Sequence, residues 1–325
     1  MPLDPRLQTL LEQIATSTQE RSIQCDPMEV LARLRANTSP QEVKQMLETL
    51  GIELEPVAHV EDHVIPGPAG DIPVRLYTPE GAGPFPILVF FHGGGWIAGN
   101  LATHDPLSRS LCRAAECLVL SVDNRLAPEH KFPAGVHDCY AATCWMAAHA
   151  IEFHGDPARI AVAGDSAGGN FAAVVAQMIR DQGGPALLFQ LLLWPPMDFR
   201  VTTASWKEYD GYLMTSQDFI VVKDLYLNHE EEQFHPYAAP LLTTDLQGLP
   251  PVLIITAECD PLRDGGEQYG QRLVEAGVFA TVSRYDGMVH GFMSMKTIVP
   301  ERASQALAQT SRALRTAFSD VDRCS

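Results

Sequence analysis

Long apolar runs alternate with amphipathic stretches over most of the chain. Such runs are typical of strands that are buried on both faces of a sheet, and they are found at residues 85–91, 117–122, 160–164, 187–193 and 252–256. Apolar residues at helical spacing lie between them, over residues 106–115, 134–149, 170–180, 265–276 and 302–318. The alternation predicts an α/β fold with a mainly parallel sheet of about eight strands and helices on both faces.

Three further strands are expected near the two ends of this pattern, over residues 59–65, 72–77 and 280–285. The first two are joined by a turn at residues 67–71, which is too short for the crossover that parallel strands need. We therefore expect these two strands to be antiparallel.

Two segments fall outside the alternation. Residues 7–50 have helical spacing, with a helix start at Thr38–Gln41, and residues 198–246 are polar, with a capping-box pattern at Thr215–Asp218. We predict that the two segments fold together as a cap. The expected division is residues 1–55 as N-terminal cap helices and residues 56–325 as the main domain, with 198–246 contributing to the cap.

Composition excludes several partners. The formal net charge of -17 over 325 residues argues against a surface that binds nucleic acid. The seven cysteines form no C-x-x-C pair, which favours a reducing compartment. The first residues do not resemble a signal peptide, and no apolar run approaches the ~20 residues that a membrane span needs. We predict a cytoplasmic protein without a membrane span.

The most informative motif is Gly164–Gly168, which has the form G-x-S-x-G. It lies between a predicted strand and a predicted helix, which is the context of a nucleophile elbow. The small residues around Ser166 suit a strained turn that exposes the hydroxyl. The alternative is a glycine-rich turn with an incidental serine.

A serine nucleophile needs a base that is oriented by a third group, and in this arrangement the chain order is serine, acid, histidine. Asp260 follows the strand at residues 252–256 and is the predicted acid, with Glu258 as the competing choice. His290 follows the last predicted strand in a glycine-flanked loop and is the predicted base.

The predicted oxyanion hole consists of backbone amides. Ala167 follows the nucleophile, and Gly93 and Gly94 belong to the loop His92–Trp96 after the strand at residues 85–91. His92 is expected to brace this loop. A phosphate-binding loop is the alternative, but neither the Walker lysine nor G-x-G-x-x-G spacing is present.

Together with two further motifs, Asp123–Glu129 and Phe132–Ala134, these motifs resemble the bacterial hormone-sensitive-lipase-like esterases of the α/β-hydrolase superfamily. The resemblance spans about residues 55–320. It implies an α/β-hydrolase fold with a helical cap and a serine carboxylesterase that acts on short- to medium-chain acyl esters. It also implies that Asp165 supports the elbow and nearby loops, and that the chain forms a homodimer through the edge strand near the last β element.

The sequence departs from the family pattern at Asn124, at Trp194-Pro195 and at Gly265-Gly266. These positions affect cap packing, pocket shape and the interface rather than the reaction. Arg125 and Glu129 are expected to share a buried salt-bridge network near the site.

The predicted partners are a small ester substrate and water, with neither a cofactor nor a metal. The predicted substrate pocket contains five residues: Trp96, Asp165, Tyr212, Leu213 and Met214. Two alternatives remain open at this point. The chain is a small-molecule-binding protein on the same scaffold, or it hydrolyses another acyl bond, in an amide, a lactone or a sugar acetate.

Overall fold

A computed structural model of the whole chain describes residues 3–18 and 26–319. Its centre is one eight-stranded sheet with the strand order β1-β2-β4-β3-β5-β6-β7-β8. The strands are β1 (His59–Gly67), β2 (Gly70–Thr78), β3 (Phe85–Phe91), β4 (Leu118–Val122), β5 (Gly155–Asp165), β6 (Phe189–Leu193), β7 (Val252–Cys259) and β8 (Ala280–Val289). All eight predicted strands are therefore confirmed.

The sheet is parallel from β4 to β8, and β1 and β2 form an antiparallel pair as predicted. β2 also pairs antiparallel with β4. From β5 onward each new strand is added at the outer edge in chain order, so β8 is an edge strand. The carboxyl ends of β5, β7 and β8 consequently lie along one rim of the sheet.

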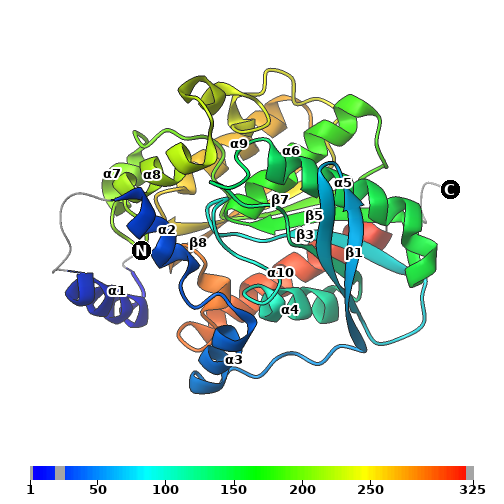
Figure 1. Cartoon of the computed structure of the whole chain (residues 1–325), viewed down its shortest axis with the longest axis horizontal. Coiled ribbons are helices and arrows are strands. Elements are labelled where there is room, and N and C mark those ends of the chain that lie inside the picture. Colours follow the sequence, from blue (N-terminus) through cyan, green and yellow to red (C-terminus); the bar gives the residue numbers. More distant parts are fainter. Residues whose placement is uncertain (1–2, 19–25, 320–325) are drawn as a thin grey trace.

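Helices cover both faces of the sheet (Figure 1). One face is covered by α4 (Asp105–Ala115) and α10 (Pro300–Ser319), and the other by α5 (Ala134–His149), α6 (Ala167–Gln182) and α9 (Arg263–Glu275). Strand β3 contributes side chains to the hydrophobic core on each face of the sheet. Ile87, Val89 and Phe91 pack toward α5 and α6. Leu88 and Phe90 point the other way, toward α4 and α10. This double burial explains why the strands are continuous apolar runs.

The two segments outside the alternation form helices on one side of the molecule (Figure 1). They are α1 (Pro5–Thr18), α2 (Pro27–Arg35), α3 (Pro40–Thr49), α7 (Ala204–Tyr209) and α8 (Ser216–Tyr226). Ser39 and Thr215 are the N-caps of α3 and α8, so both predicted helix starts are confirmed. Helix α7, which Thr203 caps, was not predicted.

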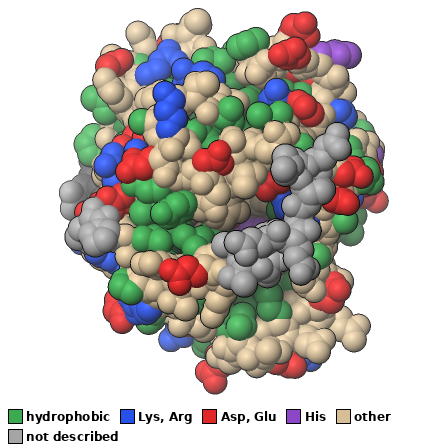
Figure 2. Space-filling model, turned by 90° about the vertical axis from the view of Figure 1, so that its left-hand side faces the viewer, with side chains coloured by type: hydrophobic (Ala, Val, Ile, Leu, Met, Phe, Trp, Pro, Cys, Tyr) green, Lys and Arg blue, Asp and Glu red, His purple; other side chains and the backbone are tan. Residues whose placement is uncertain are grey.

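Helices α2 and α8 pack together although almost 200 residues separate them. Arg33 and Asp218 join them in an ion pair of 2.8 Å. Figure 2 views the molecule from this side, where hydrophobic side chains gather among scattered charged ones. The described residues also form four short 3₁₀ helices: η1 (Ala150–Phe153), η2 (Glu230–Phe234), η3 (Pro240–Leu242) and η4 (Phe292–Ser294). No helix in the described part of the chain is both long and apolar enough to cross a membrane.

Helix α6 begins directly against β3, and this close approach requires glycine. A Cβ atom at Gly168 would collide with the carbonyl group of Phe91, and one at Gly164 would collide with the backbone of Gly168. Neither obstacle is the end of a flexible side chain, so the backbone itself would have to move.

We expect Gly168→Ala to destabilise the fold by about 3 kcal/mol, as overpacking against backbone does. Gly265→Ala, within α9, is the matched control. A Cβ atom at Gly265 would have the backbone nitrogen of Met197 as its nearest neighbour outside the helix, 3.9 Å away. That replacement should stabilise the protein by ~0.5–1 kcal/mol through helix propensity. Urea midpoints of the two variants and the wild type test this, and equal midpoints for both variants would contradict it.

Candidate active site

Ser166 lies at the sharp turn between β5 and α6. Its backbone angles are φ 50° and ψ -123°, a conformation that non-glycine residues rarely adopt. The turn is fixed by a hydrogen bond of 2.8 Å from the Ser166 amide to the carbonyl oxygen of Leu193, at the end of the neighbouring β6. The strained turn therefore lies at the rim of the sheet, as a nucleophile elbow does.

Two side chains from neighbouring strand ends approach the serine. His290 follows β8, and its Nε2 lies 3.0 Å from Ser166 Oγ. Its Nδ1 lies 2.8 Å from Oδ2 of Asp260, which follows β7. Asp260 is fully buried, and its other oxygen accepts a hydrogen bond of 2.9 Å from the Leu262 amide. The structure thus brings together three residues that are up to 124 positions apart.

The hydrogen bonds define the tautomer of the imidazole. An ionised carboxylate can only accept hydrogen bonds, so Nδ1 of His290 donates to Asp260. Nε2 is then free to accept the proton of the Ser166 hydroxyl. Burial alone would lower the pKa of His290, but the charge and hydrogen bond of Asp260, together with the charge of Asp165, outweigh it and raise that pKa.

The competing acid, Glu258, has a different partner. Its Oε2 accepts a hydrogen bond of 2.6 Å from the amide of Gly287 in β8, three residues before His290. The carboxylate beside Nδ1 of His290 is that of Asp260. The geometry therefore favours Asp260 over Glu258.

The glycine loop after β3 passes beside the elbow. The Gly93 amide donates to Oδ1 of Asp165 at 2.9 Å, and Gly93 is not on the wall of the cavity above Ser166. This geometry contradicts the expectation that Gly93 donates to an oxyanion, because its N–H already has an acceptor. Gly94 and Gly95 do line the cavity, and Nδ1 of His92 lies 2.8 Å from the Gly93 carbonyl oxygen, as expected of a brace.

A cavity of about 660 Å³ opens above Ser166 and His290. Of the five predicted pocket residues, Trp96, Asp165, Leu213 and Met214 line it. Tyr212 does not belong to the lining, and its ring packs edge-on against Tyr209 at 5.4 Å.

The sequence analysis missed several residues of the wall. They are apolar or charged side chains from α1, α2, α8 and two strand ends: Ile14, Arg33, Leu34, Trp194, Phe219, Val222 and Leu262. Trp194 follows β6 directly, at the rim where ligands bind in such sheets. Its ring packs edge-on against His290 with centroids 6.3 Å apart. The strand-end argument that selected Asp260 would also have selected Trp194.

Arg125 and Glu129 do not share a salt-bridge network, so that expectation is wrong. Arg125 pairs with the buried Asp138 at 2.7 Å. Glu129, whose side chain is 55 % exposed, pairs with Arg35 of α2 at 2.7 Å. The two side chains therefore reach different helices, α5 and α2.

A larger groove of about 1290 Å³ lies between α10 and strands β6 to β8 and contains none of the three groups at the elbow. Its size alone therefore does not identify the reactive site. Within the described residues, no three histidine, cysteine, aspartate or glutamate side chains gather as a metal site would require.

Comparison with known proteins agrees with this architecture. Residues 88–294 match a protein-family model described as the alpha/beta hydrolase fold. The carboxylesterase NlhH of Mycobacterium tuberculosis is 41% identical over 324 residues, which are 96% of either chain. The carboxylic ester hydrolase LipN of the same organism is 47% identical over 249 residues, or 74% of this chain and 66% of LipN.

Solved structures give the same result. The hyperthermophilic esterase of Pyrobaculum calidifontis superimposes with a TM-score of 0.88 at 38% identity, covering 97% of this chain and 99% of that one. A thermostable esterase of Pseudomonas putida gives 0.88 at 34% identity and covers 98% of both. These names disfavour the binding-protein alternative. The chain belongs to the α/β-hydrolase-fold family, in its hormone-sensitive-lipase-like branch, and is a carboxylic ester hydrolase.

Proposed function

We propose that the protein is a serine carboxylesterase that works through an acyl-enzyme formed on Ser166. The single observation that carries the proposal is the hydrogen-bonded series from Ser166 through His290 to Asp260, at 3.0 and 2.8 Å. His290 takes the proton of Ser166 as Oγ attacks the acyl carbonyl carbon, and it returns that proton to the leaving alcohol. Water, deprotonated by His290, then attacks the acyl-enzyme and releases the acid.

The oxyanion of each tetrahedral intermediate needs fixed N–H donors. We assign this role to the amides of Gly94, Gly95 and Ala167. Gly94 and Gly95 line the cavity beside Ser166, and no acceptor for either amide is found among the described residues. Ala167 is the first residue of α6, where an amide has no intrahelical acceptor.

The acyl pocket is closed by the predicted cap. Residues 1–55 supply Ile14 and Leu34 to the cavity wall, and residues 198–246 supply Met214, Phe219 and Val222. The ion pair of Arg33 with Asp218 holds the two parts together. A bounded apolar cavity of about 660 Å³ favours short- to medium-chain acyl groups over long ones.

The proposal is tested by hydrolysis of p-nitrophenyl acetate, butyrate, octanoate and palmitate. We expect kcat/KM to be highest for butyrate or octanoate and lowest for palmitate. A fluorophosphonate should also label Ser166 stoichiometrically, as shown by peptide mass. Turnover of p-nitroanilides, lactones or sugar acetates that exceeds ester turnover would assign the chain to another acyl bond, and a labelled residue other than Ser166 would overturn the proposal.

We expect kcat/KM to rise with pH along an acid limb whose midpoint lies above the ordinary histidine pKa of about 6.5. His290 must be neutral to accept a proton, and its neighbours favour the charged form, so a higher pH than usual is needed to deprotonate it. Rates for p-nitrophenyl butyrate from about pH 5 to about pH 9 measure this acid limb. A midpoint below the ordinary value, or a flat profile, would contradict the assignment of His290 as base.

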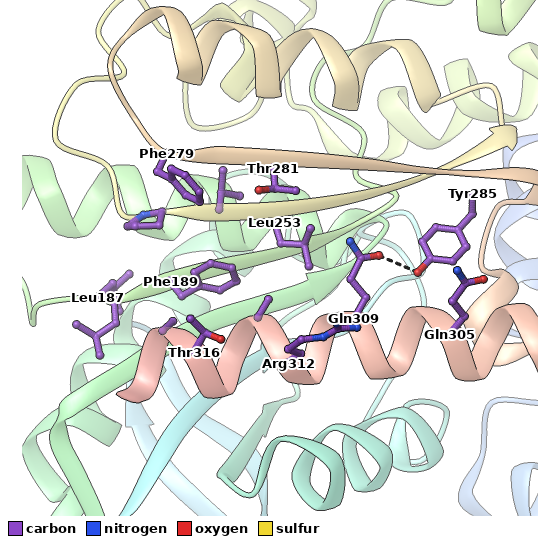
Figure 3. Close-up of a pocket in the computed structure, with 15 residues that line it drawn as sticks. Leu187, Phe189, Leu253, Phe279, Thr281, Tyr285, Gln305, Gln309, Arg312 and Thr316 are labelled. Atoms are coloured by element: carbon purple, nitrogen blue, oxygen red, sulfur yellow. Dashed lines mark hydrogen bonds between the residues drawn. The ribbon is translucent and has the colours of Figure 1, made fainter. Parts of the chain in front are cut away.

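We also propose that two chains pair through β8. Within the described part of the chain, the outer edge of this strand has no neighbour in the sheet, and open edges are templates for another strand. Phe279, directly before β8, is 74% exposed and lines the large groove along α10 (Figure 3). Phe279→Asp should convert a dimer into a monomer in sedimentation velocity, and a wild-type monomer would refute the pairing.

A cytoplasmic location stays a prediction from the sequence.

A further inference from the structure

A second histidine–aspartate pair lies directly behind the elbow. Nε2 of His104 is 3.2 Å from Oδ1 of Asp165, the residue that precedes Ser166. The same oxygen accepts the Gly93 amide at 2.9 Å. Asp165 thereby links His104 to the loop that carries Gly94 and Gly95.

The hydrogen bonds around His104 show which nitrogen carries a proton. The Thr103 hydroxyl donates to the carbonyl oxygen of Asn100 at 2.9 Å, so its oxygen accepts from Nδ1 of His104, 2.8 Å away. Nδ1 is therefore protonated. If His104 were neutral, the lone pair of Nε2 would face the Asp165 carboxylate at 3.2 Å, which is repulsive. A proton on Nε2 as well, which makes an imidazolium, removes that conflict.

The pKa directions agree with this geometry. Burial alone would lower the pKa of His104, but Asp165 outweighs it and raises that pKa. Burial would raise the pKa of Asp165, but His104 and the Gly93 amide outweigh it and lower that pKa. Both directions favour a charged pair.

The other ionisable groups nearby are already neutral or engaged. Burial and the charge of His104 lower the pKa of His92, whose ring is 5.5 Å from that of His104, to about 4. Asp123, after β4, faces His92 at 3.9 Å. Asp105, which follows His104 in α4, binds Arg109 and Tyr77. The charge of Asp165 also acts on His290 and contributes to raising its pKa.

We propose that His104 is a positioning residue, and that its imidazolium offsets the Asp165 charge and keeps the Gly93 amide on that carboxylate. The proposal rests on the proposed function of Ser166. The Gly93 N–H lies between two acceptors, Oδ1 of Asp165 at 2.9 Å and Nε2 of His104 at 3.2 Å. A proton on Nε2 leaves the amide to the carboxylate, and loss of that proton makes Nε2 a competing acceptor. The loop can then shift, and the uncompensated carboxylate opposes the oxyanion beside Ser166. Activity should therefore fall at alkaline pH as His104 deprotonates.

The kinetic test compares pH profiles of kcat and KM for p-nitrophenyl butyrate. His104→Gln keeps a donor to Asp165 but does not titrate, so the alkaline limb of kcat should disappear. Its kcat at neutral pH should fall on the order of tenfold, the equivalent of about one pKa unit, with KM unchanged. Asp165→Asn should also remove the limb, and it serves as the second variant if His104→Gln does not fold. His137→Gln, at an exposed site on α5, is the control that should keep both limbs.

A spectroscopic test does not depend on turnover. In the Ser166→Ala protein, ¹⁵N correlation spectra should show His104 protonated on both nitrogens at neutral pH. It should lose the Nε2 proton at the midpoint of the wild-type alkaline limb. A neutral His104 at neutral pH, or an alkaline limb that persists in His104→Gln, overturns this inference. Activity that survives in Ser166→Ala instead overturns the proposed function, so the two failures are distinguishable.

Discussion

Replacing Ser166 by alanine is expected to lower kcat for p-nitrophenyl butyrate by a factor on the order of 10⁶, as loss of the nucleophile does in other serine hydrolases. Without Oγ no acyl-enzyme can form, and His290 has no hydroxyl to deprotonate. His290→Ala should cost about as much, because members of such a unit act together rather than additively. The double variant should therefore be no slower than either single one.

The control is a serine-to-alanine replacement away from the candidate active site. Ser304→Ala lies at an exposed position of α10 and should leave kcat unchanged. Thermal midpoints should separate loss of catalysis from loss of fold, and Ser166→Ala should not unfold earlier than the wild type. A loss below about 10³ would mean that much of the rate acceleration does not depend on Ser166, which contradicts a nucleophilic role.

Replacing Asp260 by asparagine is expected to lower kcat by about 10⁴ while the fold is kept. The asparagine side chain can present its NH₂ group to Nδ1, and the imidazole then adopts the other tautomer. Nε2 would carry the proton and could no longer accept the one from Ser166. The bond from the Leu262 amide to the other oxygen of residue 260 can persist, so the loop should keep its shape.

Glu258→Gln is the matched control, because it neutralises a carboxylate two positions away in the same strand end. The Glu258 carboxylate accepts a hydrogen bond from the backbone amide of Gly287. The side-chain oxygen of glutamine can accept the same bond. We expect less than about a tenfold loss, the size of a modest positioning effect. A larger loss in Glu258→Gln than in Asp260→Asn would assign the orienting role to Glu258.

The strand and helix pattern was predictable because burial on both faces forces continuous apolar runs, as in β3 and β7. Ser166, Asp260 and His290 were predicted as a triad by a topological argument, since each follows a strand and strand ends share one rim. Such an argument needs only chain order. It does not depend on which way a side chain turns.

Residues whose role depends on a partner from another element were not predictable in this way. The Gly93 amide was misassigned because its acceptor, Asp165, comes from β5, and nothing local in the loop His92–Trp96 marks that bond. Arg125 and Glu129 were paired by proximity in the sequence, whereas their partners come from α5 and α2. The sequence places Tyr212 beside Leu213, but consecutive side chains of an irregular segment point in different directions.

The position of β8 at the end of the sheet has a consequence for how the enzyme is lost under stress. The proposed base, His290, directly follows β8, which has one neighbouring strand among the described residues, whereas Ser166 directly follows β5, which has a neighbour on each side. Local opening of edge elements costs less free energy than global unfolding. Once the proposed pairing through β8 is lost, fraying of this strand would withdraw His290 while the two cores persist, so inactivation would precede denaturation. The edge strand, rather than the buried centre, then sets the working lifetime of the enzyme.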